Sequence, residues 1–136
     1  MKIVRAGSTP TMRAPDGAAT GDVWQDPIID APAPGRLKAL RVTFAPGART
    51  SWHTHPLGQT LYVLAGVGRF QSEGQPVREI RAGDVIWIAP GENHWHGASP
   101  DTMMTHLAMQ EMQGGVHVAW TDEVSDADYG AAPATD

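Results

Sequence analysis

Glycine and proline interrupt the whole chain, and this limits what the chain can fold into. The 136 residues include 15 Gly and 11 Pro, spread along the sequence without a period. Proline breaks the hydrogen bonding of helix interiors and central strands, and glycine favours turns. Helix is therefore expected to be scarce, and the chain is expected to form short strands joined by many turns.

Between the turns lie short runs rich in residues that favour β-strands. The predicted strands are Leu37 to Ala45, Thr60 to Leu64, Gly68 to Gln71, Val77 to Ile80, Val85 to Ile88, His94 to Ala98, Met103 to Glu111 and Val116 to Trp120. Their spacing predicts an all-β domain over residues 35–120, a small antiparallel sandwich or barrel.

The two ends of the chain differ from this central domain. Residues 1–34 are broken by many Pro and Gly and predict an arm that packs on the barrel or on a neighbouring subunit, with only short extended pieces such as Asp22 to Gln25. Residues 121–136 predict a short helix and a tail, because Thr121 or Ser125 can cap a helix whose first turn carries acids.

Composition excludes several functions. The formal net charge is -5, so a nucleic-acid partner is disfavoured. The chain has no cysteine, which leaves His, carboxylate, amide or water as metal ligands. No apolar run is long enough to span a bilayer, and the first residues lack a stretch of signal-peptide length. We therefore expect a cytoplasmic protein with no membrane partner.

Five of the six histidines lie between residues 53 and 106. Residues i and i+2 of a strand share a face, so His53 pairs with His55, and His94 pairs with His96. By the same parity His106 shares a face with Gln110 on its own strand. Imidazoles from three strands can thus converge inside one barrel, and a divalent cation would explain that convergence.

The histidines are expected to differ in role. His-x-His spacing on a strand predicts that His53, His55 and His94 are metal ligands. For His96 and His106, direct catalytic work and hydrogen bonding to ligands or substrate are both open. His117 lies outside the cluster and is interpreted as a structural residue.

The five tryptophans show no common strand-face spacing and are interpreted as core and interface residues. Trp52 and Trp95 have the opposite parity to the neighbouring histidines, so we expect them to pack outside the barrel lumen.

Two motifs resemble the cupin family. Gly47-x5-His53-x-His55-x3-Gln59-x6-Gly66 is similar to the first cupin motif, in which Glu normally stands at the position of Gln59. The segment GDVIWIAPGENHWHG, from Gly83 to Gly97, is similar to the second motif, with its proline displaced by one position. The resemblance implies a single-domain jelly-roll barrel that forms homodimers or homotetramers, with the arm adding a strand to a neighbour.

The match is narrower still within cupins. The strings PGARTSWHTHPLGQT, PGENHWHGA and MTHLAMQE resemble the small bacterial cupins that are hydroxynitrile lyases, which cleave or form cyanohydrins with a divalent metal. The resemblance implies manganese, with iron, zinc, nickel or cobalt as alternatives. It also implies a ligand set and two groups near the substrate: ligands His53, His55, Gln59 and His94, and substrate neighbours His96 and His106.

Gln59 in place of a carboxylate has a chemical consequence. Three imidazoles and an amide are all neutral, so the ion would keep its full charge and act as a strong Lewis acid. Neutral ligands also disfavour a trivalent metal, which weighs against oxygen activation. A degenerate site without metal is the alternative interpretation of Gln59.

We hypothesise that proton transfer to a histidine starts the reaction. His106 or His96 takes the hydroxyl proton of a cyanohydrin, the carbon–carbon bond breaks, and an aldehyde and cyanide leave. Leu40, Val42 and Phe44 share a parity on one strand, and we expect a substrate pocket formed by this face together with Gln110 and, at its mouth, Thr50. Leu40 is bulky and is expected to narrow the pocket against aromatic aldehydes.

Two other classes of function are compatible with the sequence. One is a different metal-dependent cupin enzyme, an oxygenase or an isomerase. The other is a non-catalytic cupin that binds a small molecule, although no helix-turn-helix segment or basic patch accompanies the barrel.

Overall fold

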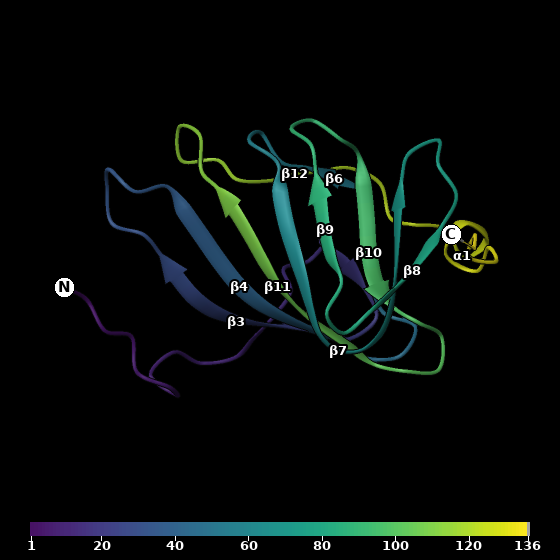
Figure 1. Ribbon diagram of the computed structural model, residues 1–136, viewed down its shortest axis with the longest axis horizontal. Helices are drawn as coiled ribbons and strands as arrows, with labels where there is room; N and C mark the ends of the chain where they lie inside the picture. Colours follow the sequence, from purple (N-terminus) through teal and green to yellow (C-terminus); the bar gives the residue numbers. More distant parts are fainter. Residues whose placement is uncertain (136) are drawn as a thin grey trace.

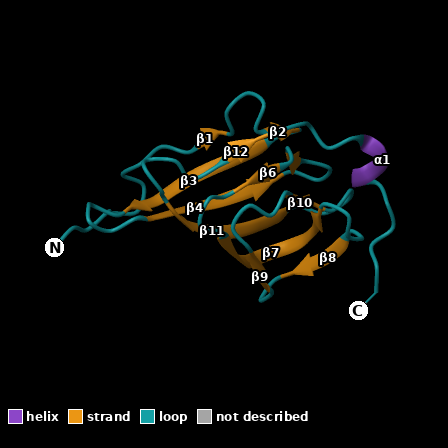
Figure 2. Ribbon diagram, turned by 90° about the horizontal axis from the view of Figure 1, so that it is seen from above, coloured by secondary structure: helices purple, strands orange, loops and turns teal. Residues whose placement is uncertain are grey.

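Strands form nearly all of the regular structure in the computed structural model, which describes residues 1–135 (Figures 1 and 2). The elements are β1 Met12–Arg13, β2 Ala19–Thr20, β3 Val23–Asp30, β4 Leu37–Phe44, β5 Arg49–Thr50, β6 His53–Thr54, β7 Gln59–Ser72, β8 Arg78–Arg81, β9 Val85–Ile88, β10 His94–Ala98, β11 Met104–Glu111, β12 Ala119–Trp120 and α1 Asp126–Tyr129. The one helix among residues 1–135 has four residues, so no helix there could cross a bilayer.

The strands form one curled antiparallel sheet, in the order β1-β3-β4-β11-β7-β10-β5-β2. Strand β7 joins the two halves of the curl: its first part pairs with β11 and β9, and its second part pairs with β10 and β8. The all-β antiparallel fold with a short C-terminal helix is therefore confirmed. The concave inner face encloses the main core, which includes Phe44, Leu61, Val63 and Met104.

Most predicted strands lie within one residue of the observed ones, but β7 is a single strand where we expected two. The predicted break falls at Gly66, which has φ of 80°. A Cβ at Gly66 would lie 1.8 Å from the backbone oxygen of Met103, so only glycine fits there. The backbone turns at this glycine and the ladder continues, which carries β7 from one half of the sheet to the other.

Two further predictions of strand length were wrong. The N-terminal segment contains the eight-residue strand β3, because Pro27 sits where the register with β4 shifts and so disturbs the ladder little. At the other end, the predicted strand from Val116 shortens to β12. There Gln113 and Val116 close a turn across Gly114 and Gly115, both with positive φ.

The C-terminal segment packs on the outside of the curl. Ser125 caps α1, its hydroxyl accepting a hydrogen bond from the backbone N–H of Asp128 (3.1 Å). Beneath the helix lies a second apolar cluster of Val77, Trp95, Val124 and Tyr129, with Trp52 against it. The prediction that Trp52 and Trp95 pack outside the lumen is thus confirmed, since neither lines the central cavity.

Candidate metal centre and cavity

Histidines from β6 and β10 meet at the centre of the curled sheet. His53 lies directly opposite His94 in the ladder of these two strands. One ring nitrogen from each of His53, His94 and His96 lies within 4.8 Å of the other two, and all three residues are buried. This three-histidine group is the densest cluster of potential metal ligands among residues 1–135.

Backbone carbonyls hold the Nδ1 atoms of three histidines. The pairs are His53 with Ser51 (2.8 Å), His55 with His117 (2.6 Å) and His94 with Glu92 (2.8 Å). A carbonyl oxygen can only accept, so each Nδ1 carries the hydrogen and each neutral ring presents a lone pair at Nε2. This arrangement is typical of imidazoles that bind a metal through Nε2.

Several buried polar atoms have no partner within residues 1–135. Among them are Nε2 of His55, Nε2 of His94 and Oε1 of Gln59. A buried polar atom without a hydrogen bond is costly, which calls for a ligand. Imidazole nitrogens and an amide oxygen, with no thiolate, suit a divalent first-row cation.

The structure does not bring all four predicted ligands equally close. His53 and His94 belong to the group within 4.8 Å, together with His96, whereas His55 is not part of it. His55 stacks edge-on against His53, with ring centroids 5.0 Å apart, and Gln59 lines the same cavity.

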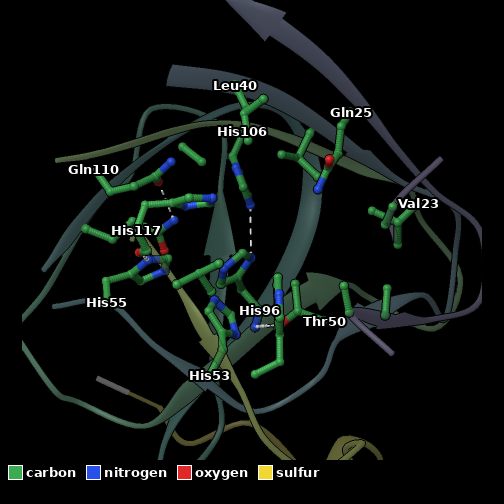
Figure 3. Close-up of a pocket in the computed structure, with 18 residues that line it drawn as sticks. Val23, Gln25, Leu40, Thr50, His53, His55, His96, His106, Gln110 and His117 are labelled. Atoms are coloured by element: carbon green, nitrogen blue, oxygen red, sulfur yellow. Dashed lines mark hydrogen bonds between the residues drawn. The ribbon is translucent and has the colours of Figure 1, made fainter. Parts of the chain in front are cut away.

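His96 and His106 form a buried pair on the cavity lining (Figure 3). Nε2 of His106 is 2.9 Å from Nδ1 of His96, so one ring donates to the other. The other nitrogen of each ring, Nε2 of His96 and Nδ1 of His106, has no partner within residues 1–135. Phe44 packs against both rings, with centroids 5.9 and 5.3 Å away.

The histidines are neutral near pH 7. Burial disfavours the imidazolium and is the largest cause of a lowered pKa for every one of the six. It lowers the pKa of His94 and of His106 to about 4. A neutral imidazole can bind a cation or accept a proton, which are the two tasks expected of this cluster.

The cavity itself is concave and mostly apolar. Its volume is about 50 Å³, small beside the roughly 300–1,000 Å³ of typical small-molecule sites, and the cavity is open to solvent at its mouth. Predicted residues that line it are Leu40, Val42, Thr50, His53, His55, Gln59, His96, His106 and Gln110. Phe44, which we expected in the pocket, is fully buried behind the rings of His96 and His106 and does not line the cavity. The Thr50 hydroxyl also accepts a hydrogen bond from the backbone N–H of His96 (3.2 Å), which ties β5 to β10.

Sequence reasoning missed part of the lining. Ala14, Ala18, Ala19, Val23 and Gln25 come from the segment expected to be an arm. The parity of Val23 and Gln25 within the predicted extended piece was the available signal.

A second part of the lining was also not predicted. It is formed by the segment that follows β11, where His117, Val118 and Trp120 line the cavity. His117 acts partly through its carbonyl, which receives the Nδ1–H of His55, and Trp120 packs on His53 with centroids 4.6 Å apart. No sequence pattern marks either contact.

Comparison with known proteins agrees with this geometry. Residues 40–109 match the family described as the cupin domain. The chain is 54% identical over 129 residues to "(R)-mandelonitrile lyase" of Granulicella tundricola, covering 95% of this chain and 98% of the relative.

Solved structures agree as well. A cupin-like protein from Thermotoga maritima is 35% identical over 95% of both chains, with a TM-score of 0.82. A polyketide cyclase from Streptomyces resistomycificus shares the fold at 21% identity, with a TM-score of 0.74 over 95% of this chain and 90% of its own. The curled sheet, its histidine centre and these matches together show that the chain belongs to the cupin family.

Proposed function

We propose that this cupin is a metal-dependent hydroxynitrile lyase, which reversibly splits a cyanohydrin into an aldehyde and hydrogen cyanide. The observation that carries the proposal is the set of buried neutral histidines around one apolar cavity, in a chain 54% identical to a mandelonitrile lyase. Such a cavity offers both cation ligands and proton acceptors within reach of one small molecule.

The proposed metal ligands are His53, His55, Gln59 and His94. Each of the three imidazoles has its Nδ1 held by a backbone carbonyl, which leaves Nε2 for the ion, and Oε1 of Gln59 has no hydrogen-bond partner among residues 1–135. His96 differs, because its Nδ1 is engaged by another imidazole. When bound, a divalent ion here, manganese by preference, would supply Lewis acidity that lowers the pKa of a substrate hydroxyl.

We assign proton transfer to the His96–His106 pair. Both rings are neutral, and each has one nitrogen without a hydrogen-bond partner in the described part of the chain, so the pair can accept the hydroxyl proton of the cyanohydrin. The electrons of the broken O–H bond form the carbonyl, the carbon–carbon bond breaks, and the cyanide carbon takes the proton to leave as hydrogen cyanide. In synthesis the pair returns the proton to the oxygen.

The apolar wall receives the side chain of the substrate. Leu40 and Val42 contribute from β4, and the N-terminal segment adds Val23 from the neighbouring strand β3 together with three alanines. These groups exclude water and leave the reacting carbon near the polar end of the cavity.

The reaction itself is the first test. The protein, stripped of metal and then reloaded with manganese, is mixed with mandelonitrile, and benzaldehyde release is followed by absorbance. We expect release far above the metal-free sample. Release equal to that control, across several cyanohydrins and metals, would refute the lyase.

Metal content and turnover together separate ligands from acid-base groups. His53→Ala and His94→Ala should lose bound metal by elemental analysis, whereas His106→Ala should keep the metal and lose turnover. Unchanged metal content would exclude the substituted residue as a ligand, and full activity of His106→Ala would exclude it as an essential base.

A homodimer or homotetramer in the cytoplasm is the proposed state of the protein. In support, the outer face of the sheet across β9, β7 and β11 exposes large apolar side chains, including Val85, Trp87 and Tyr62, 62%, 63% and 40% exposed. A face of this kind on a small protein is typical of a protein–protein contact.

A further inference from the structure

The side-chain amide of Gln59 must be oriented for this residue to hold a cation. An amide has one oxygen that can bind a cation and one NH2 group that cannot, and the two exchange places when the group rotates by half a turn. Gln59 is the first residue of β7 and is 4% exposed, so water cannot select the orientation.

Gln110 is the partner of that amide. In the ladder between β7 and β11, Gln110 stands directly opposite Gln59. Nε2 of Gln59 donates a hydrogen bond to Oε1 of Gln110 over 2.9 Å, and Gln110 is also 4% exposed. Oε1 of Gln59 therefore has no hydrogen-bond partner among residues 1–135, and Gln59 lines the cavity. Gln110 is labelled in Figure 3.

The histidines of the proposed site are oriented differently. Backbone carbonyls hold their Nδ1 atoms, so no side-chain substitution at the carbonyl residue removes the acceptor. Gln59 alone among the four proposed ligands depends on another side chain for its orientation. From this contrast we infer that Gln110 is a positioning residue, which turns the oxygen of Gln59 toward the ion. The inference rests on the four-residue site proposed above.

A double-mutant cycle on metal affinity tests this role. The dissociation constant for Mn²⁺ is measured by chelator competition for the wild type and Gln110→Leu, and again for both in a Gln59→Glu background. Leucine fills similar space but accepts no hydrogen bond, so we expect 10- to 100-fold weaker binding, the usual effect of losing an orienting partner of a metal ligand. A carboxylate presents oxygen in either orientation, so in the Gln59→Glu background the same change should weaken binding only a few-fold.

Two further variants keep the result interpretable. Gln25→Leu makes the same change at another glutamine of the cavity lining, and within residues 1–135 the Gln25 side chain makes no hydrogen bond to Gln59. Its affinity should stay within about threefold of the wild type. Gln110→Met, an unbranched chain without an acceptor, should repeat the loss if Gln110→Leu folds poorly.

The outcomes separate this inference from the lyase proposal. Equal losses in both backgrounds would show that Gln110 acts through packing, and no loss, or no Mn²⁺ binding by the wild type, would overturn the inference outright. If Gln110→Leu weakens Mn²⁺ binding as expected but the protein releases no aldehyde, the positioning role of Gln110 is supported and only the lyase proposal is refuted.

Discussion

The role of each histidine in this site depends on the hydrogen-bond partners of its two ring nitrogens. Where a backbone carbonyl takes Nδ1, as for His53, the ring is fixed with its lone pair at Nε2. Where two imidazoles meet, as in His96 and His106, a proton can be shared between them. Spacing along the sequence identified the cluster, but not these contacts, because a carbonyl acceptor such as that of His117 belongs to any residue type.

Burial of these rings makes stability depend on pH. The pKa of His106 is about 4 in the folded protein and near 6.5 in an unfolded chain, so the unfolded state binds the proton first as pH falls. The contribution is fully present above about pH 6.5 and is lost as pH falls toward 4. For His106 the shift corresponds to about 3 kcal/mol.

This predicts the behaviour of metal-free protein in urea. The free energy of unfolding should fall between pH 7 and pH 4, and in His106→Phe the fall should be smaller by about 3 kcal/mol, because one buried group no longer titrates. Urea titrations at several pH values measure both slopes. Parallel curves for variant and wild type would contradict the assignment.

Leu40 should select substrates by size. It lines the cavity from β4, so Leu40→Ala enlarges the space for the substrate side chain. We expect the ratio of kcat/KM for mandelonitrile to that for acetone cyanohydrin to rise about tenfold. Phe44→Leu is the matched control, since Phe44 does not line the cavity and its change should move both substrates together. An unchanged ratio in Leu40→Ala would show that Leu40 does not limit access.

At the scale of elements, strand positions were predictable where Gly and Pro bounded apolar runs, as for β9 and β10. The strand predictions were wrong where a strand continues through a proline or glycine. Pro27 lies at the register shift of β3, and Gly66 lies in the middle of β7. In both cases pairing with neighbouring strands on either side overcomes the local tendency of proline or glycine to end a strand. The paired residues are distant in the sequence, so a local pattern does not reveal them. The short strands β5 and β6 carry too few residues to show any period.

Gly66 allows β7 to serve both halves of the sheet, which can be tested against a glycine of similar backbone. Gly74 has φ of 78°, like the 80° of Gly66, but a Cβ at Gly74 would meet no atom within 4 Å, whereas a Cβ at Gly66 would meet the Met103 carbonyl. Gly74→Ala should cost about 1 kcal/mol from φ alone, and Gly66→Ala about 2–4 kcal/mol. Equal losses in chemical denaturation would mean that the close approach is not needed.

At the scale of the whole molecule, the inner and outer faces of the curled sheet have separate tasks. The inner face carries the histidines and the cavity, and its wall is completed by segments from both ends of the chain, including Gln25 and Trp120. Which segments close the wall could not be predicted, because this depends on how the sheet curls rather than on local pattern. Residue parity did predict inward-facing side chains on β4 and β11, since Leu40, Val42, His106 and Gln110 all line the cavity.

The outer face is suited to a second copy of the chain. Val85, Tyr62 and Leu107 stand side by side across β9, β7 and β11, and the row continues to the Arg41–Asp26 ion pair. An apolar centre with both signs of charge at its edge is complementary to itself, as a two-fold contact requires. The five strands β9, β7, β11, β4 and β3 lie about 4.8 Å apart, and their outer face covers roughly 600 Å² in projection. Stable interfaces bury about 800 Å² of surface on each partner, which is a similar area.

Val85→Glu should therefore dissociate the proposed homodimer or homotetramer. Two copies would bring like charges into one apolar contact, so sedimentation velocity should show a species of 14.5 kDa where the wild type sediments as a dimer or larger. Val116→Glu is the matched control: Val116 is 53% exposed but lies in the turn between β11 and β12, outside the pairings of β9, β7 and β11, and its change should leave the association unchanged. A wild type that sediments as a single chain, or a Val85→Glu variant that still associates, would assign the outer face to another role. Because the cavity opens on the inner face, dissociation should leave metal binding intact, and the two faces can be tested one at a time.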